Sequence, residues 1–255
     1  MAVLTKTEQR VMGLLSDGSV FTIGFIRVVL GRKRFMAASM LNKVILGLVK
    51  KGALTRITRG TYLVFKGNTS FDPYTIAPYL SKGGYIGMES ALMLYGYKSA
   101  VGRQIDVISS GKSLAQRLIN GYRYRLVPMH DLAFGAVQFE GYAVSSKAKT
   151  LFDCIYRIKY VNDFGALLSL IRDMKKEDYK EFIEYTSLVN ASSFFERCGI
   201  LLKAGGAPQR IMQRMKSRIG KPVVIRLKPN LESRGAYSKE WSVYDNIGLE
   251  RLRRW

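Results

Sequence analysis

The chain has 255 residues, 47% of them hydrophobic and 24% charged, which is typical of a folded globular protein and argues against a disordered one. No run of about 18 uncharged apolar residues occurs, so we expect no membrane contact. Polar Thr5, Lys6, Glu8 and Arg10 occupy the place of a signal-peptide core. Cys154 and Cys198 are expected to be buried thiols of a cytoplasmic protein.

Charge is the strongest compositional signal. Lys and Arg number 41 against 19 Asp and Glu, for a formal net charge of +22. Residues 1–66 hold 12 Lys and Arg but only Glu8 and Asp17 as acids, and residues 200–255 hold 13 basic against four acidic residues. A protein this basic usually binds a polyanion. The excess at the two ends predicts nucleic-acid binding, above all by the N-terminal segment.

Three helices are predicted in the first 51 residues. The first starts at the capping-box pair Thr5 and Glu8 and is expected to stop at Asp17-Gly18. The second is capped by Thr22 and ends at Gly31. The third runs from about Phe35 to Lys51, with Gly52 just beyond its end. Its apolar stripe is Ala37, Leu41, Val44, Ile45, Leu48 and Val49.

A β-hairpin is predicted after the third helix. Residues 53–57 and 61–65 are rich in β-forming side chains and flank Thr58-Arg59-Gly60. Three helices closed by a basic hairpin predict a winged helix-turn-helix domain over residues 1–66.

The expected DNA contacts follow from that geometry. One face of the third helix packs on the core, so the opposite face is free to enter a major groove. Asn42 is suited to adenine and Lys43 to guanine or phosphate, whereas the cations before the helix and on the wing suit phosphates or the minor groove. The candidate DNA-binding residues are Arg32, Lys33, Arg34, Ser39, Asn42, Lys43, Arg56 and Arg59.

Residues 67–255 are predicted to form a mixed α/β domain after a polar boundary near residue 67. Helices are expected at 72–80, 88–95, 148–158, 162–172, 176–189, 192–202 and 208–218. Strands are expected at 104–108, 123–128, 136–139, 142–144, 223–227 and 240–246, with a hairpin turn at 139–142. The fold class is therefore α/β (α+β).

Several segments, in order along the chain, resemble the AbiE-type antitoxin family, the DNA-binding partners of nucleotidyltransferase toxins in abortive-infection operons. The similar segments are Leu54–Tyr62, Tyr85–Leu92 with Tyr95-Gly96-Tyr97, Tyr142–Asp153, Arg226–Asn230 with Gly235, and Lys239–Val243 with Asn246.

The resemblance implies a winged helix joined to a C-terminal α/β domain. It implies a repressor that binds inverted repeats of double-stranded DNA before its own operon, with two copies per operator, and counters a cognate nucleotidyltransferase toxin. Only the winged-helix cations carry over as site residues. A stand-alone transcription factor that responds to a ligand in its C-terminal domain stays open as an alternative.

Enzymatic readings are weaker. The single histidine, His130, has no nucleophile motif around it. Ser110-Gly111-Lys112-Ser113 resembles the end of a phosphate-binding loop, but the required earlier glycine is Asp106. A metal nuclease built on Asp106, Glu140 and Lys149 lacks diagnostic spacing and stays open only as the least favoured alternative. We therefore expect no enzyme, no cofactor and no metal site.

A second basic surface is possible near the C-terminus. Arg210, Arg214 and Arg218 are spaced by four, on one face of a predicted helix. They suit DNA phosphates, an acidic toxin surface, or simply solvent.

Overall fold

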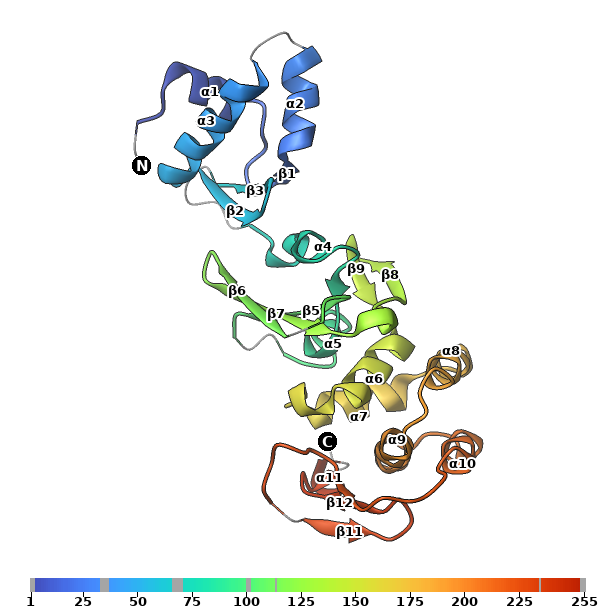
Figure 1. Cartoon of the computed structure of the whole chain (residues 1–255). Coiled ribbons are helices and arrows are strands. Elements are labelled where there is room, and N and C mark those ends of the chain that lie inside the picture. The colour runs from blue at the N-terminus through green and yellow to red at the C-terminus, as the bar shows by residue number, and fades with distance from the viewer. Residues whose placement is uncertain are drawn as a thin grey trace. The chain divides into compact units, whose positions relative to one another are not determined.

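The computed structural model describes residues 3–32, 37–65, 71–99, 102–112, 114–233 and 235–252 (Figure 1). The chain divides into two compact units. Unit 1 comprises Met1–Gly84 and Arg103–Pro128, and unit 2 comprises Tyr85–Gly102 and Met129–Trp255. Both contain helices and strands, so the predicted mixed α/β class is confirmed at that level. The expected boundary near residue 67 lies outside the described residues and stays a prediction.

The N-terminal part of unit 1 has three helices and a small antiparallel sheet. In chain order, its elements are α1 (Lys6–Met12), β1 (Val20–Thr22), α2 (Ile23–Arg32), α3 (Ala38–Lys50), β2 (Leu54–Thr58) and β3 (Thr61–Val64). The strand order is β1-β3-β2, so β3 is central. Strand β1 was not predicted, because three residues carry almost no periodic signal.

Local hydrogen bonds explain where these helices begin and end. Thr5 and Glu8 form the predicted capping box at α1, and the Thr22 hydroxyl accepts from the Phe25 amide at the start of α2 (3.2 Å). At the end of α3, Gly52 is left-handed (φ +72°) and the Ala53 amide bonds Leu48 O (3.0 Å). That pattern satisfies carbonyls that the helix leaves unpaired.

Three local expectations were wrong. Helix α1 ends at Met12, and Gly13 occupies its C-terminal cap. Glycine loses more backbone freedom in a helix than other residues do, which favours the end at this point. Helix α2 continues through Gly31 to Arg32, since one helical glycine costs only about 1 kcal/mol and the surrounding structure overrides it. Ala37 is exposed and caps α3 rather than packing in its stripe.

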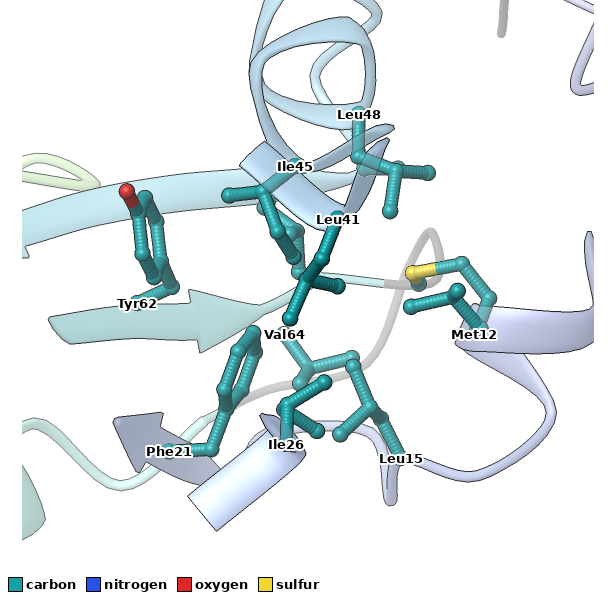
Figure 2. Close-up of a cluster of buried hydrophobic side chains, with 12 residues drawn as sticks. Met12, Leu15, Phe21, Ile26, Leu41, Ile45, Leu48, Tyr62 and Val64 are labelled. Atoms are coloured by element: carbon teal, nitrogen blue, oxygen red, sulfur yellow. The ribbon is translucent and has the colours of Figure 1, made fainter. Parts of the chain in front are cut away.

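The core of this part lies between α1, α2, α3 and the sheet (Figure 2). Leu41, Ile45 and Leu48 project from one side of α3 and are each 1% exposed or less. They meet Phe21 and Tyr62 of the sheet, whose rings stack at 5.7 Å. Burial of one such aliphatic side chain contributes about 1.5–3 kcal/mol, which fixes the orientation of α3.

The rest of unit 1 consists of three paired strands and a short helical segment. Strands β5 (Gln104–Ser109) and β7 (Tyr122–Pro128) pair in parallel, and β6 (Ala115–Ile119) pairs antiparallel with β7. The helix expected at 72–80 is instead a 3₁₀ turn, Pro73–Ile76, followed by the single α-turn α4 (Ala77–Leu80). Pro78 lacks the amide hydrogen that an uninterrupted helix over residues 72–80 would need at that position.

Unit 2 places two groups of strands among helices. Strand β9 (Tyr142–Ser145) pairs with β4 (Tyr85–Ile86) and β8 (Ala136–Phe139). Strand β12 (Val243–Asp245) pairs with β10 (Ile225–Arg226) and β11 (Ala236–Ser238). The helices are α5 (Met88–Leu94), α6 (Lys147–Tyr156), α7 (Phe164–Asp173), α8 (Lys176–Thr186), α9 (Ser192–Gly205), α10 (Gln209–Ser217) and α11 (Leu249–Leu252), with 3₁₀ turns at His130–Leu132 and Ile158–Tyr160.

Most expected elements of unit 2 occur, with shifted ends. The strand expected at 240–246 is shorter, because residues 239–241 form a turn and Ser242 is left-handed (φ 56°). Short β4, β11 and α11 were not predicted. Within the described part of the chain, no helix has both the length and the apolar character needed to cross a membrane.

Candidate nucleic-acid interface

Helix α3 presents an exposed polar face. Because Leu41, Ile45 and Leu48 anchor the opposite side in the core, Ser39, Asn42 and Lys43 are exposed. Three of the predicted contact residues therefore lie on one accessible surface of the same helix. Met40 and Leu46, which are 50% and 56% exposed, lie on the same helix. Their side chains are suited to apolar contact with a thymine methyl group.

The β2–β3 hairpin presents the next two predicted cations. Arg59 and Gly60 form its turn, and Gly60 is left-handed (φ +77°), a conformation that glycine adopts without a side-chain clash. Arg56 and Arg59 are exposed. The Gly60 carbonyl accepts from the Ile23 amide (2.8 Å), which ties the turn to the start of α2. The hairpin that carries both cations, Arg56 in β2 and Arg59 in the turn, is thus tied to the same helical core as α3.

The remaining predicted contacts cannot be placed as side chains. Lys33 and Arg34 lie outside the described residues, as does the side chain of Arg32, the last residue of α2. The positive charge of residues 1–66 is opposed by only two acidic residues. Of these two, Glu8 pairs with Lys51 at 2.5 Å, and Asp17 accepts from the Gly18 amide (3.0 Å).

A second hairpin beside the β2–β3 hairpin was missed. The Thr55 hydroxyl donates to the Asn120 side-chain oxygen (3.1 Å), and Arg117 donates to the Ile57 carbonyl (3.3 Å). These bonds join the β6–β7 hairpin to β2 within unit 1. The hairpin turn is Asn120-Gly121, with both residues left-handed (φ 46° and 79°).

This second hairpin adds cations with little opposing charge. Arg103, Arg117 and Arg123 are exposed, and Arg103 lies over the Tyr122 ring (5.9 Å). The only acid from Arg103 to Pro128 is Asp106, which is buried and bonded to Arg125 by two 2.8 Å contacts. The Asn-Gly pair was the available signal, because it is a strong marker of a two-residue hairpin.

Two of the three residues weighed for a metal nuclease are bonded to other side chains. Asp106 is paired with Arg125. Lys149 and Asp153 form an ion pair in which both side chains are fully buried. Glu140 is the exposed, left-handed residue of the β8–β9 turn. Among the described residues, no cluster of three or more metal-ligating side chains occurs.

The three C-terminal arginines are exposed, but they do not act alike. Arg218 donates to the Val189 carbonyl (3.1 Å) and lies over the Phe195 ring (5.2 Å). Arg210 and Arg214 instead line a cavity between α8 and α10. The predicted surface is therefore divided into one packing arginine and two cavity-lining ones. Cys154 and Cys198 are buried free thiols, as expected.

Comparison with known proteins adds information on the fold. No protein-family model matches the sequence, and no curated protein matches it. The structure is similar to the crystal structure of the RV2827C protein from Mycobacterium tuberculosis. The TM-score is 0.69 and the identity 18%, over 99% of this chain and 96% of that one. The likeness at this identity concerns the fold and extends over the mixed α/β arrangement.

Proposed function

We propose that this protein is a sequence-specific repressor that binds double-stranded operator DNA through an N-terminal winged helix-turn-helix. The observation that carries the proposal is the exposed face of α3, which holds Ser39, Asn42 and Lys43 beside a basic hairpin. An α-helix fits the major groove, and an exposed Asn and Lys on it suit adenine and guanine edges.

The cations divide by role in this proposal. Side chains on α3 read bases, while Arg56 and Arg59 on the wing and the segment 32–34 hold phosphates. Arg123 of the β6–β7 hairpin and Arg103, which immediately precedes β5, extend the phosphate contacts, and Arg117 positions that hairpin against β2. An inverted-repeat operator takes two copies of the chain, one per half-site.

The experiment is a salt titration of binding to the DNA upstream of the gene. Each phosphate that a cation neutralises adds about 0.9 to the slope of log K against log salt. The double variant Arg56→Ala/Arg59→Ala is expected to lower the slope by about 2. The matched control, Lys159→Ala/Lys239→Ala, removes two exposed cations of unit 2 and is expected to leave the slope unchanged. Equal slopes for all three proteins would contradict the assigned wing contacts.

We further propose that repression serves a toxin–antitoxin operon of the AbiE type. This step is supported by the ordered resemblance of the sequence segments. It predicts a nucleotidyltransferase gene beside this one, whose product arrests growth when expressed alone. Co-expression of the wild-type chain is expected to restore growth. Expressing both genes from a foreign promoter separates direct neutralisation from repression, and persistent arrest there would exclude direct neutralisation.

A further inference from the structure

Helices α8 and α10 of unit 2 flank a cavity of about 670 Å³. Its apolar lining comes from Tyr179 and Ile183 of α8 and from Ile211 of α10. Tyr179 and Ile211 are 4% exposed, and the Tyr179 hydroxyl donates to the Ile171 carbonyl (2.8 Å). That hydroxyl therefore has its own partner, and the apolar surface left open to a bound group is small and comes mainly from half-buried Ile183.

Cations line both sides of this groove. Lys176 and Lys180 lie one turn apart on α8, and Arg210 and Arg214 lie one turn apart on α10. All four are exposed. Within the described part of the chain, the ion pairs involve none of them. Four cations without acidic partners around an apolar lining favour a ligand that has both carboxylates and an apolar group.

Two acids in the same groove argue against a nucleic acid. Glu177 and Glu184 of α8 also line the cavity, and they would repel a closely packed row of phosphates. A phosphate backbone also has no apolar group to cover the lining residues. A protein segment meets both demands, because its side chains alternate in character and leave room for the two glutamates. Interfaces of this kind are commonly anchored by one large apolar side chain within a charged rim.

We propose that the groove between α8 and α10 binds an acidic segment of a partner protein. An apolar side chain of that segment packs against Tyr179, Ile183 and Ile211. Its carboxylates pair with Lys176 and Lys180 on one side and with Arg210 and Arg214 on the other. This inference goes beyond DNA binding and does not depend on it, since the groove lies wholly in unit 2 and the candidate DNA interface in unit 1.

The test is selection of a displayed random 16-residue peptide library on the full wild-type chain. We expect the enriched peptides to carry several Asp or Glu around at least one large apolar residue. Their affinity, measured by fluorescence anisotropy, is expected to fall about tenfold or more in Arg210→Glu/Arg214→Glu, because two attractive charges become repulsive. The matched control Lys159→Glu/Lys239→Glu makes the same charge change elsewhere in unit 2 and is expected to bind as the wild type does.

A second variant tests the apolar lining. Ile183 is half-buried, so Ile183→Ser is compatible with the fold, which circular dichroism checks, and it is expected to weaken the same peptides. Failure to enrich acidic peptides, or equal binding by the charge-reversed variant, would overturn the proposal. Displacement of the peptides by duplex DNA would assign the surface to nucleic acid instead. Operator binding by Arg210→Glu/Arg214→Glu, equal to that of the control, is expected to persist and keeps the two proposals separable.

Discussion

Lys149 and Asp153 are a fully buried ion pair one turn apart on α6. The Lys149 ammonium lies 5.0–5.8 Å from the ring centres of Phe134, Phe152 and Tyr185. Burial raises the pKa of Asp153 to about 7 and lowers that of Lys149. Both shifts favour the uncharged forms. One proton shared between the two groups keeps the net charge of the pair at zero, whichever residue holds it. Both residues belong to Tyr142–Asp153, one of the segments that carried the family resemblance.

We predict that removing one residue of this pair destabilises the protein more than removing both. Lys149→Met alone or Asp153→Leu alone leaves one buried group without its partner, which costs about 3–5 kcal/mol. The double variant is expected to cost much less than the sum, because no unpaired charge remains. Urea unfolding of the four proteins gives the coupling free energy. Additive losses would contradict the assigned pairing.

Gly199 of α9 packs closely against Trp241. A Cβ atom at residue 199 would lie 1.9 Å from the indole ring, and Trp241 is only 1% exposed. We predict that Gly199→Ala destabilises unit 2 by about 3 kcal/mol, at the upper end of the usual cost of overpacking. Thermal unfolding followed by Trp fluorescence measures it. Gly165→Ala in α7, where a Cβ would have only an ordinary 3.4 Å contact, is the control and is expected to change stability by less than about 1 kcal/mol.

Residue-level rules predicted what depends on neighbours in sequence. The Thr5–Glu8 box, the Thr22 cap and the left-handed Gly52 follow from spacings of a few residues, and all three occur. The contact of Gly199 with Trp241 joins residues 42 positions apart. Nothing in the local pattern indicates it, because it depends on how α9 meets the residues before β12.

At the scale of elements, one side chain joins α1 to the end of α3. Glu8 accepts from the Thr5 amide (2.7 Å) and pairs with Lys51 just beyond α3 (2.5 Å). Gly47 gives it room, since a Cβ there would lie 2.6 Å from the Glu8 carboxylate. The Lys51 ammonium and the Thr5 amide lower the pKa of Glu8 below its usual 4.5.

This contact predicts a pH-dependent contribution to stability. The folded-state pKa lies below the unfolded one, so the contribution is present above about pH 4.5 and is lost as pH falls through the folded value. Glu8→Gln keeps the capping hydrogen bond but removes the charge, and we expect a loss of about 1 kcal/mol at pH 7. The difference from wild type, measured by urea unfolding, is expected to shrink below pH 4. A difference that is constant with pH would contradict the ionic role of Glu8.

The elements that sequence reasoning missed are mostly those without a strong period. Strand β6 is exposed at four of its five residues, so no hydrophobic alternation reveals it. Its turn, Asn120-Gly121, was the usable signal. The exposed face of α3 was predictable because the buried stripe of α3 is strongly periodic. The groove between α8 and α10 was not, because it requires two helices to be placed side by side.

At the scale of the whole molecule, the basic residues divide between the two units in different settings. In unit 1, exposed cations accompany an exposed helix face and two hairpins. In unit 2, Arg210 and Arg214 surround an apolar lining together with two glutamates. The basic residues behind the net charge of +22 therefore contribute to two chemically distinct candidate surfaces. The proposed account assigns the first to DNA phosphates and bases and the second to an acidic protein.

The measurement that tests the account most directly is selection of duplexes from a random-sequence DNA pool at physiological salt. We predict enrichment of one inverted repeat, bound by two copies of the chain, that also occurs upstream of the gene. Asn42→Ala is expected to lose about 1–3 kcal/mol of discrimination at one position of each half-site while keeping the salt dependence of binding. Base recognition by α3 would be contradicted if the wild-type chain enriched no sequence. It would also be contradicted if Asn42→Ala/Lys43→Ala selected the same sequence as strongly as the wild type does.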